Sequence, residues 1–185
     1  MTIDGAVPTR QLLPHPDTPP SGAPFKLWVN VDYAAAFGLN ATINMAFGVG
    51  APAERFLIPE ADEPGRRDKL WQTTCFEAFL RVEGERDYSE WNFAPSGDWA
   101  AYAFTDTREG MAEADIVAPP YVRFEDNFTW WTVGATIAVP VAERIALGLS
   151  AVIEQADGTK SYWALAHPPG APDFHHDDCF VARLP

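Results

Sequence analysis

Residues 70–110 constrain the fold of this chain more than any other stretch, because they combine three strand patterns with two short turns. Side chains of opposite character alternate through residues 72–82, 87–94 and 99–105, as they do along strands. The first turn contains glycine, and the second is Pro95-Ser96-Gly97-Asp98, a composition typical of tight reversals. A parallel return would need a crossover of about a dozen residues or more. The stretch therefore predicts an antiparallel meander of three strands.

One face of this meander carries polar side chains. In the first strand Glu77 alternates with Phe76 and Ala78, so the glutamate lies on the opposite face from both apolar neighbours. In the second strand Glu90 and Asn92 share a face, because they are two residues apart. We therefore expect one face of the meander to carry Glu77, Glu90 and Asn92.

Strand patterns recur before and after the meander, and almost no helical period appears between them. They are predicted at residues 25–33, 39–49, 55–59, 121–124, 128–139, 146–155, 160–167 and 179–184. Ala156-Asp157-Gly158-Thr159 is typical of a hairpin turn, so the strands on either side of it should pair antiparallel. No internal repeat is visible. Many short strands separated by turn signals predict an all-β fold, an antiparallel β-sandwich.

The first 24 residues have a different composition from the rest. They contain six prolines and little apolar periodicity, which disfavours both a helix and a central strand. We expect residues 1–24 to form an extended proline-rich arm and residues 25–185 to form one sandwich domain. A chain of 185 residues is long enough for one well-buried core.

The net charge of −13 at pH 7 repels phosphate backbones and anionic lipid surfaces. Neither a nucleic acid nor a membrane is therefore expected as a partner. The N-terminus lacks the pattern of a secretory signal, and no apolar run approaches the ~18 residues that span a bilayer. We expect a cytoplasmic protein in which Cys75 and Cys179 are reduced. The sequence does not indicate an oligomeric state.

Several separated motifs resemble those of a known family, in the same order. They are WQTTCFEAFL and YSEWNFAPSGDWAAYAF in the meander, and SAVIE, SYWALAHP and PDFHH further along. With these motifs the chain, from about Phe25 to its end, resembles a bacterial branch of the DOMON-like proteins, related to family 9 carbohydrate-binding modules. The resemblance implies a jelly-roll or immunoglobulin-like β-sandwich whose relatives bind sugars or haem. It does not imply a known reaction.

Sugars are held by aromatic platforms together with planar polar groups that match their hydroxyls. Trp71 stands just before the first meander strand, where a flat indole can stack on the C–H face of a pyranose. Trp163 and His167 share a strand face, so a cleft combining them with Glu77 and Asn92 is possible. We predict a non-catalytic module for a small polar ligand, a saccharide or sugar-derived metabolite. The predicted ligand-binding residues are Trp71, Glu77, Glu90, Asn92, Arg108, Glu154, Trp163 and His167.

Haem and a metal ion are the alternatives as cofactors, and no cofactor is predicted. Some DOMON relatives ligate haem through Met and His. The candidates here are Met45 with His167 or His175, and Met111 as a further candidate. Residues 167–178 hold three of the four histidines and three aspartates, the residue types of a transition-metal site. The adjacent His175 and His176 would point to opposite sides of an extended chain, and the spacing is no recognised motif.

Catalysis and a purely structural or partner-binding role are the remaining alternatives. Glu77, Glu90 and Glu154 lie on predicted strands, and two carboxyl groups about 5 to 9 Å apart can hydrolyse a glycoside. The sequence contains no G-x-S-x-G, G-x-G-x-x-G or P-loop pattern. A structural domain would instead pair Glu77 and Asn92 internally, bury Trp71 and leave no open cleft.

Overall fold

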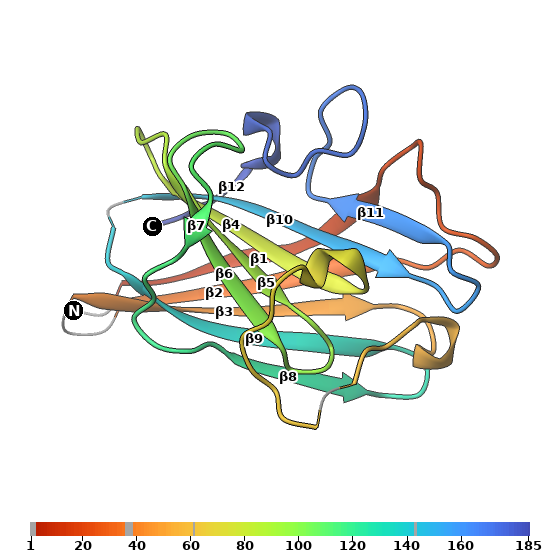
Figure 1. Ribbon diagram of the computed structural model, residues 1–185. Helices are drawn as coiled ribbons and strands as arrows, with labels where there is room; N and C mark the ends of the chain where they lie inside the picture. The colour runs from red at the N-terminus through yellow and green to blue at the C-terminus, as the bar shows by residue number, and fades with distance from the viewer. Residues whose placement is uncertain (1–2, 36–38, 61, 143) are drawn as a thin grey trace.

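The computed structural model describes residues 3–35, 39–60, 62–142 and 144–185, and within these ranges it contains strands and short 3₁₀ turns but no α-helix (Figure 1). The strands are β1 (Ile3–Pro14), β2 (Leu27–Ala35), β3 (Asn40–Val49), β4 (Cys75–Val82), β5 (Tyr88–Phe93), β6 (Trp99–Phe104), β7 (Ala112–Glu113), β8 (Tyr121–Asp126), β9 (Trp131–Pro140), β10 (Ile145–Glu154), β11 (Lys160–Ala164) and β12 (Ala182–Leu184). The 3₁₀ turns are η1 (Ala53–Arg55), η2 (Leu70–Gln72) and η3 (Asp177–Cys179). In this part of the chain no helix has the length and apolarity needed to cross a membrane. The all-β prediction is confirmed.

The strands form one hydrogen-bonded path that folds into two facing layers. The order is β7-β6-β5-β4-β10-β11-β1-β2-β3-β9-β8, and β12 pairs with β10 beside β11 (Figure 1). We call the layer of β2, β3, β8 and β9 sheet A, and the layer of β4–β7 and β10–β12 sheet B. The predicted meander is confirmed, since β4, β5 and β6 are antiparallel neighbours. So is the hairpin that joins β10 to β11.

Strand β1 belongs to both sheets. From Ile3 to Leu12 it pairs with β2 in sheet A, and its last two residues pair with β11 in sheet B. The predicted division between an arm and a domain at residue 24 therefore differs from the structure, which builds residues 3–14 into the sandwich. Pro8 is tolerated because it lies in the register shift between Val7 and Arg10, and Pro14 because it ends the strand.

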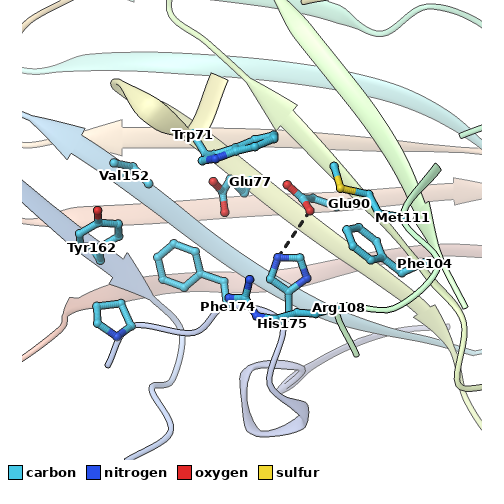
Figure 2. A pocket seen from close by; sticks show the side chains of 11 residues that line it. Trp71, Glu77, Glu90, Phe104, Arg108, Met111, Val152, Tyr162, Phe174 and His175 are labelled. Atoms are coloured by element: carbon cyan, nitrogen blue, oxygen red, sulfur yellow. Dashed lines mark ion pairs between the residues drawn. The ribbon is translucent and has the colours of Figure 1, made fainter. Parts of the chain in front are cut away.

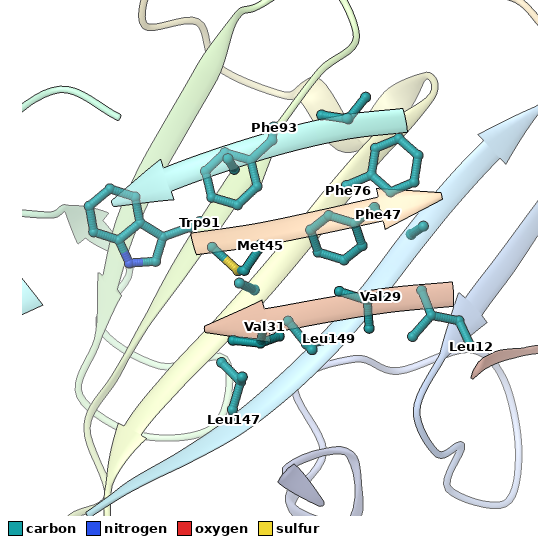
Figure 3. Packing of buried hydrophobic residues seen from close by; sticks show 14 of the residues in the cluster. Leu12, Val29, Val31, Met45, Phe47, Phe76, Trp91, Phe93, Leu147 and Leu149 are labelled. Carbon is teal, nitrogen blue, oxygen red and sulfur yellow. The ribbon is translucent and has the colours of Figure 1, made fainter. Parts of the chain in front are cut away.

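The space between the sheets is filled by apolar side chains from alternate positions of the facing strands. Figure 3 shows Phe47 and Met45 of β3 packing toward Phe76 and Trp91 of sheet B, and the rings of Phe47 and Phe76 lie 5.1 Å apart. Met45 is buried in this core, whereas His175, a candidate partner in binding haem, packs on the ring of Phe79, which belongs to a separate apolar cluster. The core between the sheets uses the inner face of sheet B, and the outer face of that sheet does not contribute to it.

The outer face of sheet B carries a second apolar cluster, covered by residues 165–181, which we call the cover segment. Phe174 and Phe180 of this segment pack on Phe79 and its neighbours from β4, β5 and β6. Glu77 and Glu90 lie on this same face, as predicted, because Glu77 pairs with Asn92 and Phe79 pairs with Glu90 in the meander. The polar residues of the meander are thus enclosed between sheet B and the cover segment.

Candidate ligand-binding site

A cavity of about 330 Å³ opens between the outer face of sheet B and the cover segment. Figure 2 shows Trp71 on one side of it, Phe174 and His175 on the other, and Glu77 and Glu90 between them. Its lining comprises Trp71, Glu77, Glu90, Phe104, Arg108, Met111, Val152, Tyr162, Pro172, Phe174 and His175. The volume lies in the range of small-molecule sites, about 300 to 1,000 Å³.

The 3₁₀ turn η2 places Trp71 at the rim of the cavity. It starts after Lys69, whose φ of 63° turns the chain sharply before β4. The indole of Trp71 meets the ring of Tyr102 edge-on, with centroids 5.8 Å apart, and the Tyr102 hydroxyl donates a hydrogen bond to Asp68 Oδ1 at 2.8 Å. Trp71 is thus held at the rim while remaining partly exposed.

Glu77 lies at the floor of the cavity and is only 3% exposed. Ser150 on β10 donates a hydrogen bond from Oγ to its Oε2 at 3.1 Å. Burial, and then the nearby carboxyl group of Glu90, raise the pKa of Glu77 from 4.5 to about 8. At neutral pH its carboxyl group is therefore protonated, and it can both donate and accept a hydrogen bond.

Glu90 is held from below by Asn92. The Asn92 amide donates from Nδ2 to Glu90 Oε1 at 2.7 Å, and Cys75 Sγ lies 3.4 Å from Asn92 Oδ1 on the other side. Burial raises the pKa of Glu90, whereas the bond from Asn92 opposes that rise. Asn92 is fully buried and does not line the cavity, so it positions Glu90 instead of facing a ligand.

Arg108 and the cover segment close the remaining side of the cavity. Arg108 adopts a φ of 57° and donates from Nε and Nη2 to Asp173 Oδ1 at 3.1 and 2.7 Å. His175 Nδ1 lies 2.7 Å from the Tyr88 hydroxyl, and its Nε2 lies 3.6 Å from Glu90 Oε2. Burial and then the charge of Arg108 lower the pKa of His175 to about 4, so the imidazole is neutral at pH 7.

No protein-family model and no curated protein matches this sequence. Its fold does match solved structures. A Bacteroides uniformis protein to which carbohydrate binding has been ascribed superposes with a TM-score of 0.59 at 12% identity, over 95% of this chain and 84% of that one. A family 9 carbohydrate-binding module from Caldicellulosiruptor kristjanssonii in complex with glucose superposes with a TM-score of 0.57 at 10% identity, over 88% of this chain and 77% of that one. A complex of such a module from the same organism with cellotriose gives 0.52 at 10% identity, over 81% and 70%.

The fold is that of a family 9 carbohydrate-binding module. At this level of identity the match concerns the β-sandwich and its topology, and it confirms the fold that the sequence motifs implied. None of the three matched structures is described as a DOMON protein, so that part of the resemblance stays a prediction.

Four of the predicted residues lie outside the cavity, namely Asn92, described above, and Trp163, His167 and Glu154. Trp163 faces the core between the sheets and is 1% exposed, and His167 Nε2 contacts the Leu13 carbonyl at 2.8 Å. The cleft that the sequence allowed between these two residues, Glu77 and Asn92 does not form, because β11 ends at Ala164 and its period places Trp163 on the inner face. Glu154 lies beyond the cavity, with Oε2 3.7 Å from Lys160 Nζ.

Sequence reasoning also missed a large part of the lining. Its missed members are Phe104, Val152, Tyr162, Pro172 and Phe174. Met111 was considered only as a haem ligand, whereas His175 was considered as a haem or metal ligand and as one of two adjacent histidines, either of which could line a pocket or cap the sheet. Phe104, Val152 and Tyr162 follow from the strand period, once the outer face of sheet B is known to be covered. Phe174 and His175 come from a cover segment without any period, and the aromatic run PDFHH was the one signal for them.

The structure separates most of the cofactor candidates from one another. Met111 and His175 both line the cavity, whereas Met45 and His167 do not. His167 packs edge-on against His15, with ring centroids 4.9 Å apart. Within the described ranges, no group of three or more His, Cys, Asp or Glu side chains is arranged to hold a metal ion.

Proposed function

We propose that the protein binds a small saccharide or sugar-derived metabolite in the cavity on the outer face of sheet B, without transforming it. One observation carries the proposal. The cavity is open, and it combines an aromatic side wall, formed by Trp71, with buried carboxyl groups from Glu77 and Glu90. Family 9 modules of the same fold that were solved with glucose and with cellotriose support a saccharide as the ligand class.

The chemistry of the lining matches the two kinds of surface on a sugar. The flat indole of Trp71 and the ring of Phe174 offer apolar faces for the C–H groups of a pyranose. Glu77 and Glu90 offer carboxyl oxygens to its hydroxyl groups, which both donate and accept. A structural role would leave Trp71 buried and the cleft closed, so the partly exposed indole and the open cavity favour binding.

The placement of the carboxyl groups favours binding over hydrolysis. A glycosidase holds its two carboxyl groups on either side of the scissile bond. Glu77 and Glu90 instead rise from adjacent strands on the same floor of the cavity. Burial raises the pKa of both carboxyl groups, whereas a general acid and an ionised partner need environments that shift their pKa values apart.

Replacing Trp71 by alanine should weaken sugar binding at least about tenfold, because the apolar face of the sugar loses its stacking partner. Isothermal titration with glucose and with cellotriose measures the change. Trp130→Ala is the matched control, since Trp130 is also partly exposed but lies against Trp28 on sheet A, and it should leave the affinity unchanged. Equal binding by wild type and Trp71→Ala, or no binding across common mono- and oligosaccharides, would refute the proposal.

A further inference from the structure

The lining of the cavity contains more carboxyl groups than basic groups that are charged at pH 7. It contains two buried carboxyl groups, of Glu77 and Glu90, and one guanidinium, of Arg108. Both hydrogen bonds that Arg108 makes through Nε and Nη2 go to Asp173 Oδ1, so its charge is already matched by that aspartate. His175, the other basic group of the lining, has its pKa lowered to about 4 by burial and is neutral. No cation is hydrogen-bonded to either glutamate among the described residues, although the charge of Arg108 partly opposes the rise in the pKa of both.

Each glutamate also has one oxygen without a close donor. Ser150 donates to Oε2 of Glu77, and among the residues that the structure describes none donates a hydrogen bond to its Oε1. Asn92 donates to Oε1 of Glu90, whereas its Oε2 lies 3.6 Å from His175 Nε2, too far for a hydrogen bond. Neither of these oxygens is among the fully buried polar atoms that lack a partner, and both glutamates line the open cavity, so both oxygens can accept hydrogen bonds from a ligand.

The remaining walls suit a positive charge as well as a sugar ring. Trp71, Phe104, Tyr162 and Phe174 line the cavity, and the face of an aromatic ring attracts a cation within about 6 Å of its centroid. Arg108 is the sole Lys or Arg among the lining residues of the described chain. A cationic ligand therefore meets carboxyl groups on the floor and aromatic rings at the sides.

We propose that the preferred ligand is an amino sugar, whose ammonium group binds between Glu77 and Glu90. This inference rests on the proposed function and narrows it from saccharides in general to those that carry a protonated amine. The ammonium group donates up to three hydrogen bonds, and its positive charge pairs with carboxylates on the floor of the cavity once Glu77 has lost its proton. A neutral sugar supplies donors but no charge, and therefore binds more weakly.

Binding of the ammonium group is accompanied by release of a proton. Burial and Glu90 raise the pKa of Glu77 to about 8, so in the free protein its carboxyl group carries a proton at pH 7. A cation beside it favours the carboxylate. The Glu77 O–H bond then breaks, the proton passes to the buffer and the ligand amine keeps its own proton.

Other titratable and charged groups surround Glu77. They are Cys75 on β4, Tyr88 and Glu90 on β5, Arg108, and Asp173 and His175 of the cover segment. Burial raises the pKa of Cys75 and of Tyr88, which stay protonated, and it lowers that of His175, which stays neutral. Burial raises the pKa of Asp173, but the hydrogen bonds from Arg108 outweigh this effect, so the pKa of Asp173 is lowered. Proton release therefore reports on the two glutamates.

The experiment compares sugars that differ by one substituent. Isothermal titration at pH 7 uses glucose, N-acetylglucosamine, glucosamine, and the glucose analogues with an amino group at C3 or C6. At least one free amine should bind about tenfold or more tighter than glucose, the factor expected for one charge-assisted hydrogen bond. The measured heat of binding of this amine should also differ between phosphate and Tris buffers, because the released proton is taken up by buffers with different heats of ionisation. N-acetylglucosamine, which has no charge, should show neither effect.

Two variants test whether the glutamates cause the preference. Glu77→Gln and Glu90→Gln should each reduce the affinity ratio between the best amine and glucose to near one, whichever way the separate affinities move. Glu154→Gln, on β10 outside the cavity, is the matched control and should keep the wild-type ratio. Circular dichroism confirms that each variant folds. If one glutamate variant does not fold, the amine preference is tested with the other variant and with the buffer dependence of the heat of binding to the wild-type protein.

The outcomes separate this inference from the proposed function. Equal affinity for glucose and for all three amines, or tighter amine binding that survives both Glu→Gln changes, overturns the amine preference and leaves sugar binding intact. Absence of binding by every sugar overturns both. Tighter amine binding with proton release, lost in the glutamate variants, supports both.

Discussion

Replacing Glu77 by glutamine should stabilise the ligand-free protein by several kcal/mol at pH 8 and by much less at pH 5. The pKa of Glu77 rises from 4.5 to about 8 on folding, so between these pH values the folded state binds a proton that the unfolded state has lost. Stability from this group is therefore full below pH 4.5 and is lost as the pH rises toward 8. A tenfold change in an acid dissociation constant corresponds to about 1.4 kcal/mol. Glutamine has nearly the same shape as the protonated acid and does not titrate, so the variant does not lose this stability as the pH rises.

Urea unfolding of wild type and Glu77→Gln between pH 5 and pH 8.5 measures this effect as a difference in the free energy of unfolding. The neutral His175 works in the opposite direction, because its lowered pKa costs stability as the pH falls, but it is present in both proteins and cancels. Glu154→Gln is the control for removing a strand glutamate. A difference between wild type and Glu77→Gln that is flat across this range would show that Glu77 is ionised in the folded protein.

Replacing Trp131 by alanine should cost about 3 to 5 kcal/mol of the free energy of unfolding. Its indole is fully buried between the sheets and packs on Phe56, Phe76 and Phe124, with ring centroids 5.4 to 5.7 Å away. The loss approaches the whole stability of a typical domain, about 5 to 15 kcal/mol. One feature reduces the cost, because Trp131 Nε1 is buried without a hydrogen-bond partner among the described residues.

The adjacent tryptophan provides a matched control for this change. Trp130 precedes Trp131 in the sequence, is 39% exposed and contacts Trp28 on the outer face of sheet A. Trp130→Ala should cost below about 1 kcal/mol, since it opens no cavity in the core. Urea unfolding of both variants measures the contrast. Similar losses in the two would mean that the interior between the sheets does not dominate stability.

The parts of this molecule that local sequence determines were predicted well. Side-chain alternation placed most strands within a few residues, since a strand with one buried face repeats every second position. The shared face of Glu77 and Glu90 followed from a tight turn, which fixes how the neighbouring strands pair. These two residues, with Trp71 and Arg108, are the predicted residues that line the cavity.

The parts that depend on distant contacts were not predictable in the same way. Strand β1 was not predicted, because its prolines disfavour a strand and the sequence does not show that a register shift accommodates Pro8. Trp163 looked like a binding residue, but strand period alone does not reveal which of its two faces meets the other sheet. The cover segment has no period, so nothing in the sequence indicated that Phe174 would lie over the meander.

The double membership of β1 has a consequence for the order in which the molecule assembles. Where β1 passes from one sheet to the other, His167 contacts Leu13 across a separation of 154 positions. Closing so long a loop costs much chain entropy, and contacts of this kind slow folding. We expect the pairing of β1 with β11 to form late, after the local hairpins have formed. The cover segment, residues 165–181, follows directly on β11. Before β1 pairs with β11, we therefore expect Glu77 and Glu90 to be in place on the meander while the wall formed by the cover segment is still absent.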